Sequence, residues 1–149
     1  MADDNKPVTG RCLCGDIRYE YRGAPLKILH CHCESCRRHT SSPVATFVCV
    51  DRGSFRFTQG APVAYKSSAH VTRTHCGRCG APMTYESERN LQQIDLYIAT
   101  LDEPASVVPT CHVHVEEQLP WFEVLDKLPR YAQSKAGSKP VRHGPRRLR

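Results

Sequence analysis

The stretch Cys76-Gly77-Arg78-Cys79-Gly80 places two cysteines three positions apart and follows them with a glycine. Cysteine pairs at this spacing let one turn of chain supply two corners of a tetrahedral zinc site, and glycine lets the backbone fold around the metal without a Cβ clash. The distant segment Cys12-Leu13-Cys14-Gly15 offers the two further thiolates that such a site needs. We therefore expect these four cysteines to form a closed, structural zinc site that ties the N-terminal strand to the middle of the chain. The alternative, a redox-active Cys-x-x-Cys pair, is typical of a βαβ context that this sequence lacks.

A second group of cysteines, Cys31-His-Cys33-Glu-Ser-Cys36, supplies three thiolates within six residues. Three protein ligands beside one open position are typical of catalytic zinc, so this group favours a second zinc with an exchangeable fourth ligand. Cys33 and Cys36 would lie near the start of a short helix, whose positive end favours thiolates. The fourth corner could instead be closed by another side chain, and the candidates are His30, His32, His39, Cys49 and Cys111.

Short runs rich in β-branched and aromatic residues recur along the chain, separated mostly by Gly, Pro, Ser or Asp. This pattern predicts a mainly β fold of many short strands. The expected strands are Ile17–Arg22, Leu26–His30, Val44–Val50, Ser54–Thr58, Val63–Ser67, Val71–His75, Met83–Glu86, Ile94–Thr100 and Val107–Val115. Only Glu34–Thr40 and Phe122–Leu125 resemble helices. We expect one domain over residues 8–132, preceded by a short lead of residues 1–7.

The chain has 149 residues, of which nine are cysteines and eight are histidines. A secreted disulfide framework predicts an even cysteine count and a secretory signal. Here the count is odd, the first residues (Met1–Lys6) are acidic and no apolar stretch follows them. The longest apolar run, Pro43–Val50, is far shorter than the ~18 residues that a membrane-spanning helix needs. We therefore expect a cytoplasmic protein whose thiols stay reduced and available to metal.

The net charge of +6 comes from the C-terminal end. Residues 135–149 contain six basic side chains and no acidic one, while the rest of the chain is balanced. A basic tail with so few apolar residues is predicted to be disordered, so we expect disorder over residues 133–149. The tail can act as a solubilising end or contact nucleic acid. Aromatic residues make up 7% of the chain, which leaves little material for base stacking elsewhere.

Several motifs follow one another in a characteristic order. They are Gly10–Tyr19, Cys31–Arg38, Cys76–Gly80, Pro109–Val113, Leu119–Phe122 and Leu128-Pro129. Together they resemble the family of glutathione-dependent formaldehyde-activating enzymes and the centromere protein V domain. The resemblance covers residues 8–132 and includes all three cysteine clusters, which makes it more specific than a single Cys-x-x-Cys pair.

The resemblance implies an Mss4-like fold of several short antiparallel sheets organised around two zinc ions. It assigns Cys12, Cys14, Cys76 and Cys79 to a structural zinc, and Cys31, Cys33 and Cys36 to a catalytic zinc with an exchangeable fourth ligand. The implied reaction is that of a carbon–sulfur lyase, which joins glutathione and formaldehyde into S-hydroxymethylglutathione or reverses that step. The implied partners are a small thiol such as glutathione and a small aldehyde.

Two features of the chain differ from the common pattern of the family. The segment His39–Pro43 stands where relatives often have a Gly/Ala-containing stretch, and His75 stands where Phe is common. His112 and Trp121 can border the site or serve as packing residues, and a tryptophan is more often a core anchor. A zinc-stabilised binding module, whose basic tail contacts nucleic acid or another acidic partner, is the alternative to an enzyme.

Overall fold

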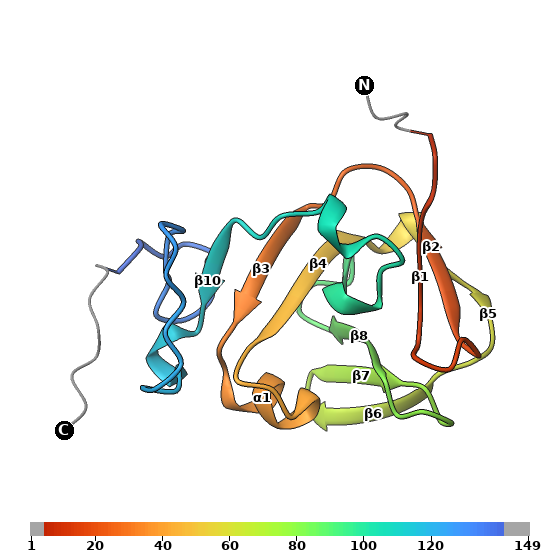
Figure 1. The fold of residues 1–149 in the computed structure, drawn as a ribbon, viewed down its shortest axis with the longest axis horizontal. Coiled ribbons are helices and arrows are strands. Elements are labelled where there is room, and N and C mark those ends of the chain that lie inside the picture. Colours follow the sequence, from red (N-terminus) through yellow and green to blue (C-terminus); the bar gives the residue numbers. More distant parts are fainter. Residues whose placement is uncertain (1–4, 142–149) are drawn as a thin grey trace. The chain divides into compact units, whose positions relative to one another are not determined.

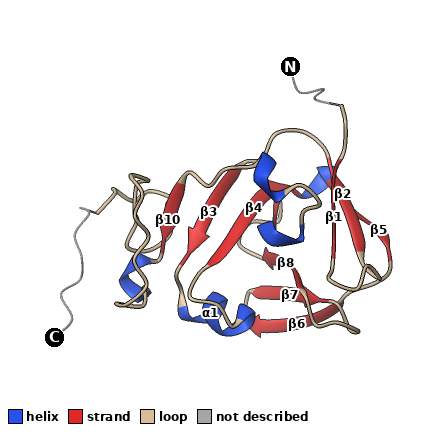
Figure 2. Cartoon of the chain, viewed as in Figure 1, coloured by secondary structure: helices blue, strands red, loops and turns tan. Residues whose placement is uncertain are grey.

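A computed structural model describes residues 5–141 of the chain, and in this part the protein is mainly β, as the sequence predicts (Figures 1 and 2). The strands are β1 (Val8–Arg11), β2 (Arg18–Tyr21), β3 (Lys27–Cys31), β4 (Ala45–Asp51), β5 (Phe55–Gln59), β6 (Val63–Ser68), β7 (Val71–His75), β8 (Pro82–Ser87), β9 (Gln93–Tyr97) and β10 (Cys111–Val113). The α-helix is α1 (Glu34–Thr40), and short 3-10 turns cover Arg52–Ser54, Ile98–Thr100, Pro104–Ser106 and Val115–Glu117.

The chain divides into two compact units. The first comprises the residues up to Lys27 together with Phe47–Val108. The second comprises Ile28–Thr46 together with the residues from Pro109 onward. Within the described residues, no helix is long and apolar enough to cross a membrane.

One sheet of the first unit is the antiparallel meander β1-β2-β5. Gly10 on β1 pairs with Tyr19 on β2, and a Cβ added at Gly10 would lie 2.2 Å from the ring of Tyr19. Glycine is therefore required at this position, because the tyrosine ring occupies the space of a side chain. Tyr19 is buried against Phe55, with 5.5 Å between the ring centroids. The turn that joins β1 to β2 carries Cys12 and Cys14.

The remaining strands of the first unit run antiparallel in the order β4-β9-β8-β7-β6. Val48, Met83 and Leu96 are fully buried and form the centre of its core. The turn between β7 and β8 contains the Cys76–Gly80 stretch, so each cysteine pair of the first unit lies in a connection between two paired strands.

In the second unit, β10 pairs with β3 in the parallel sense, with His112 opposite His30. This parallel pair occurs in addition to the antiparallel pairs that make up the expected sheets. Parallel strands need a long crossover connection, and the roughly 80 residues between β3 and β10 provide one. The segment after β10 returns beside it, because the His112 amide donates to the Pro129 carbonyl and the Tyr131 amide donates to the His112 carbonyl, each at 2.9 Å.

Local patterns predict most elements closely, and Val71–His75 and Glu34–Thr40 agree at both ends. Other expected segments change in the structure. The expected strand Val107–Val115 shortens to Cys111–Val113, and the end of Ile94–Thr100 becomes a 3-10 turn. The expected helix Phe122–Leu125 is wrong, because four residues cannot repay the cost of helix nucleation. Side chains bind its carbonyls instead: Gln118 donates to the Phe122 carbonyl at 2.7 Å.

The basic C-terminal end is described as far as Val141. There the Val141 amide donates to the Arg130 carbonyl at 2.7 Å. The rest of the tail that the sequence predicts to be disordered, residues 142–149, lies outside the described residues, as do residues 1–4 of the predicted lead.

Candidate metal centres and the histidine network

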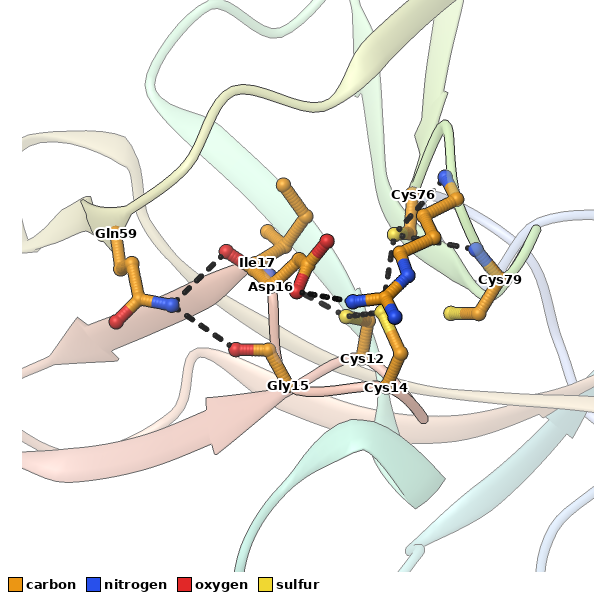
Figure 3. A network of polar contacts seen from close by, with 9 residues as sticks. Cys12, Cys14, Gly15, Asp16, Ile17, Gln59, Cys76 and Cys79 are labelled. Carbon is orange, nitrogen blue, oxygen red and sulfur yellow. Dashed lines mark hydrogen bonds and ion pairs between the residues drawn. The ribbon is translucent and has the colours of Figure 1, made fainter.

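Four cysteines of the first unit come together from the β1–β2 and β7–β8 turns (Figure 3). The sulfur atoms of Cys12, Cys14, Cys76 and Cys79 all lie within 4.8 Å of one another. Cys14 Sγ is 3.6 Å from Cys12 Sγ and 3.7 Å from Cys76 Sγ. A tetrahedron with 2.3 Å zinc–sulfur bonds has edges of about 3.8 Å, whereas a disulfide holds its sulfurs at about 2.05 Å. The spacing therefore fits a metal-binding thiol group and excludes disulfides.

Both turns fold in the same way around their first cysteine. The Gly15 amide donates to the Cys12 carbonyl at 3.2 Å, and the Gly80 amide donates to the Cys76 carbonyl at 2.9 Å. Gly15 (φ 83°) and Gly80 (φ 76°) are both left-handed, which is why glycine follows each pair. Backbone amides also point at the sulfurs, since the Ile17 amide lies 3.3 Å from Cys12 Sγ. Such amides stabilise thiolates, as metal binding requires.

Polar side chains hold these turns from outside. Gln59 donates from its amide to the carbonyls of Gly15 and Asp16 at 3.1 and 3.2 Å (Figure 3). Arg78 forms an ion pair with Asp16 at 3.1 Å and so links the two turns, although both side chains are largely exposed.

The thiols of this group differ in acidity, with pKa values shifted in opposite directions. Hydrogen bonds from the backbone at Cys14 and Ala81 lower the pKa of Cys79 to about 6. The backbone at Asp16 lowers the pKa of Cys14, but burial and the neighbouring thiols outweigh it and raise this pKa to about 12. Neighbouring thiolates thus oppose one another, and a dication among them would relieve that repulsion.

The second thiol group lies where β3 meets α1. Cys31 is the last residue of β3, Cys33 is the N-cap of α1 and Cys36 lies in the helix, with the three sulfurs within 4.8 Å of one another. The Cys36 amide donates to Cys33 Sγ at 3.4 Å. Cys31 and Cys36 are 6% and 4% exposed, whereas Cys33 is half-buried. Hydrogen bonds from the other two thiols lower the pKa of Cys33 to about 2. Cys33 is thus the thiol of this group whose ionised form its neighbours favour most.

The second group contains three ligands. Within residues 5–141, no histidine, further cysteine or carboxylate joins these sulfurs within 4.8 Å. The five side chains considered for the fourth corner are thus outside the group. They are His30, which belongs to another cluster, and His32, His39, Cys49 and Cys111.

The two arginines that follow the second group are already engaged. Arg37 donates from Nε to the His32 carbonyl and from Nη2 to the Glu117 carbonyl, each at 3.1 Å. Arg38 pairs with Glu34 one helical turn away at 2.8 Å. Arg37 therefore fixes the backbone next to the thiols.

A buried polar network, which sequence reasoning missed, lies beside β3 and β10 in the second unit. His32 Nε2 lies 2.8 Å from His112 Nδ1, and His112 Nε2 lies 2.8 Å from Asp126 Oδ2. Arg130 donates to the other oxygen of Asp126 at 3.3 Å. His112 therefore belongs to a hydrogen-bonded chain. The alternation of His30, on β3, with His32, directly after it, was a signal for a polar face, but no local pattern pointed to Asp126.

Trp121 is not a core anchor in the structure. Its side chain is 66% exposed and meets Phe122 edge-on, with 6.4 Å between the ring centroids. Because the Leu119–Leu125 segment lacks regular structure, its large apolar residues are not all turned inward.

A mainly β fold with two cysteine groups at metal-binding spacing places the chain among small β proteins with candidate metal centres. Within this class the chain belongs to the family of glutathione-dependent formaldehyde-activating enzymes, whose sequence profile matches residues 7–117. The expected family is thereby confirmed.

One curated protein and one solved structure resemble this chain, the first in sequence and the second in fold. An uncharacterized lyase of Schizosaccharomyces pombe is 33% identical over 76 residues, which are 51% of this chain and 55% of that protein. The match thus spans about half the length of that curated relative. A crystal structure of a Rhodobacter sphaeroides protein superposes with a TM-score of 0.56 at 21% identity, covering 68% of this chain and 98% of that one. This likeness shows a shared fold.

Proposed function

We propose that this protein is a zinc-dependent carbon–sulfur lyase that adds a small thiol such as glutathione to formaldehyde or another small aldehyde, and catalyses the reverse step. The observation that carries the proposal is the group of Cys31, Cys33 and Cys36, three thiols at metal-binding spacing with no fourth ligand among the described residues. Family membership supports the same reaction class.

The reaction needs no oxidant or reductant. In the forward direction a C–S bond forms between the thiol sulfur and the carbonyl carbon, and the C=O double bond becomes a single bond. The proton of the thiol ends on the carbonyl oxygen, so the product is a hemithioacetal, which for formaldehyde is the S-hydroxymethyl thiol. The reverse step breaks the C–S bond and returns that proton to sulfur.

The donor set of the second group fits a zinc ion. When bound there, zinc would stabilise the substrate thiolate and polarise the aldehyde carbonyl. Cys31 and Cys36 are buried and would hold the metal together with Cys33, which is half-buried and so more accessible to solvent than the other two. The Cys36 amide stabilises the Cys33 thiolate, and holding both substrates in one place accounts for much of the expected acceleration.

The other group, Cys12, Cys14, Cys76 and Cys79, would hold a second zinc with all four positions occupied by protein. A closed site cannot accept a substrate, so its contribution would be to stability.

Exchange between free formaldehyde and the glutathione adduct, followed by NMR on the zinc-loaded full chain, tests the proposal. We expect the protein to accelerate exchange and Cys33→Ser to abolish the acceleration. Cys111→Ser is the matched control, because it makes the same substitution at a buried thiol outside both groups, and it should keep the acceleration. A zinc-loaded protein that accelerates no thiol–aldehyde exchange would contradict the proposal.

A further inference from the structure

His32 lies between Cys31 and Cys33 of the second thiol group, but its side chain contacts different residues from theirs. Consecutive side chains in an extended chain face opposite sides. Cys31 and Cys33 meet in the thiol group, whereas the ring of His32 stacks on His112 with 5.1 Å between the centroids. His30, two positions earlier, stacks on the same His112 ring at 4.7 Å. Along residues 30–33, the two cysteines therefore belong to the thiol group, and the two histidines belong to the histidine network.

The network runs from this loop to a carboxylate far along the sequence. His32 and His112 are both 0% exposed and are joined at 2.8 Å, and His112 is joined to Asp126 at 2.8 Å. Asp126 also accepts from the Leu128 amide at 3.0 Å and from Arg130 at 3.3 Å. The Asp126 carboxylate, which Leu128 and Arg130 hold in place, therefore positions the ring of His112, and His112 in turn positions the ring of His32.

The direction of these hydrogen bonds follows from the carboxylate. Burial raises the pKa of Asp126, but hydrogen bonds from His112 and the Leu128 amide, together with Arg130, hold it below its ordinary value. An ionised carboxylate only accepts, so His112 Nε2 donates to Asp126, and the 2.8 Å hydrogen bond between His112 Nδ1 and His32 Nε2 joins His32 to the same anion. Nδ1 of His32 is buried and has no hydrogen-bond partner among the described residues, so the ring is held through its Nε2.

We propose that the chain Asp126–His112–His32 is a positioning device for the metal loop. By fixing the ring of His32 it fixes the backbone between Cys31 and Cys33, which Arg37 also holds through the His32 carbonyl. A loop that is already ordered loses less conformational entropy when it takes up a metal. Residues that support metal ligands in this way typically change metal affinity or activity 10–100-fold when replaced. The inference rests on the proposed metal site at the second thiol group.

A metal site made by the network itself is the competing explanation. His30, His112 and Asp126 each offer a ligand atom, and these atoms lie within 4.8 Å of one another. Arg130, however, places a positive charge 3.3 Å from Asp126, which disfavours a cation there. The hydrogen bonds also already use both oxygens of Asp126.

Asp126→Asn tests the proposal with almost no change in volume. It removes the negative charge and replaces one of the two acceptor oxygens by an NH2 group, which cannot accept a hydrogen bond. The affinity of the second thiol group for Co²⁺ and Zn²⁺, measured on the full chain by competition with a chelator, should fall roughly 10–100-fold. The Co²⁺ absorption bands of the three-thiolate site should also shift, while the four-thiolate site keeps its metal. Thr46→Val is the control. It removes the 2.8 Å hydrogen bond between Thr46 and His30, which is not part of the Asp126–His112–His32 series, and it should leave affinity and spectrum unchanged. Unchanged affinity and spectrum in Asp126→Asn would overturn the proposal, as would a third metal per chain that this variant loses.

A measurement on the unmutated protein covers the case in which Asp126→Asn does not fold. Two-bond ¹H–¹⁵N spectra of the zinc-loaded chain report which ring nitrogen of each histidine is protonated. We expect a hydrogen on Nε2 of His112, donated to Asp126, and one hydrogen held between His112 Nδ1 and His32 Nε2. A His112 Nε2 without hydrogen would overturn the proposal. Failure of the proposed function is distinguishable, since a protein that binds zinc at the second group but catalyses nothing can still show, or lack, the affinity change.

Discussion

Cys14 Sγ lies 3.7 Å from Cys76 Sγ although the two residues are 62 positions apart. The contact joins the β1–β2 turn to the β7–β8 turn, so a metal among these thiols would close the chain between Cys14 and Cys76 into one loop. Metal that binds only the folded chain stabilises it by roughly 4 kcal/mol when it is present at a thousand times its Kd.

Removal of metal should therefore destabilise the protein strongly. We expect a strong chelator to lower the free energy of unfolding by roughly 4 kcal/mol or more, measured by thermal or urea unfolding of the reduced chain. Cys33→Ser keeps all four cysteines of the first group, so its metal-loaded form should lose a similar amount on chelation. An unfolding midpoint that the chelator leaves in place would show that this group does not hold a structural metal.

The ion pair between Arg78 and Asp16 should contribute little, even though it links the same two turns. Its side chains are 72% and 48% exposed, and exposed pairs are worth at most about 1 kcal/mol. Arg78→Ala should leave the midpoint of urea unfolding within experimental scatter of the wild-type value and leave the metal content unchanged. Loss of metal in this variant would mean that the pair, rather than the turn backbones, holds the thiols together.

Two tyrosines on β2 form a matched pair for the cost of a buried hydroxyl. Tyr19 and Tyr21 are each 1% exposed, but the Tyr19 hydroxyl lies 2.7 Å from Thr100 Oγ1, whereas the Tyr21 hydroxyl has no hydrogen-bond partner in the described residues. Tyr19→Phe should cost about 1 kcal/mol, and Tyr21→Phe should be neutral or stabilising. Equal losses in the two variants, measured by urea unfolding, would argue against this difference in pairing.

Stability should also fall in alkali because of these tyrosines. Burial raises the pKa of Tyr19 and of Tyr21, so both stay protonated in the folded state when the unfolded chain begins to ionise near pH 10. Their contribution is complete below about pH 10 and decreases as the pH rises above it. Tyrosinate absorbance should show part of the tyrosine ionising only together with unfolding, and Tyr19→Phe should reduce that part. Ionisation of every tyrosine in a chain that keeps its far-ultraviolet circular dichroism would be the opposite result.

Local sequence was enough to predict the cysteine groups and α1. Spacing in Cys76–Gly80 and Cys31–Cys36 fixes which thiols one turn can bring together. The four ligands that a structural zinc needs then join the Cys76–Cys79 pair to the distant Cys12–Cys14 pair. The glycines after each pair also follow from local geometry, as Gly15 and Gly80 show.

The histidine network could not be predicted in the same way. His32, His112 and Asp126 are brought together by the parallel pairing of β3 with β10 and by the return of residues 126–131 beside β10. Neither event leaves a periodic signal, because a three-residue strand is too short to alternate clearly. The same lack of regular structure explains why Trp121 was expected inside and is exposed.

The zinc content of the reduced, desalted chain tests the central claim most directly. Elemental analysis should find two zinc ions per chain in the wild-type protein and one in Cys33→Ser, because only the second thiol group loses a ligand. One zinc per chain in both proteins would show that Cys31, Cys33 and Cys36 hold no metal, and would contradict the account of an open zinc site.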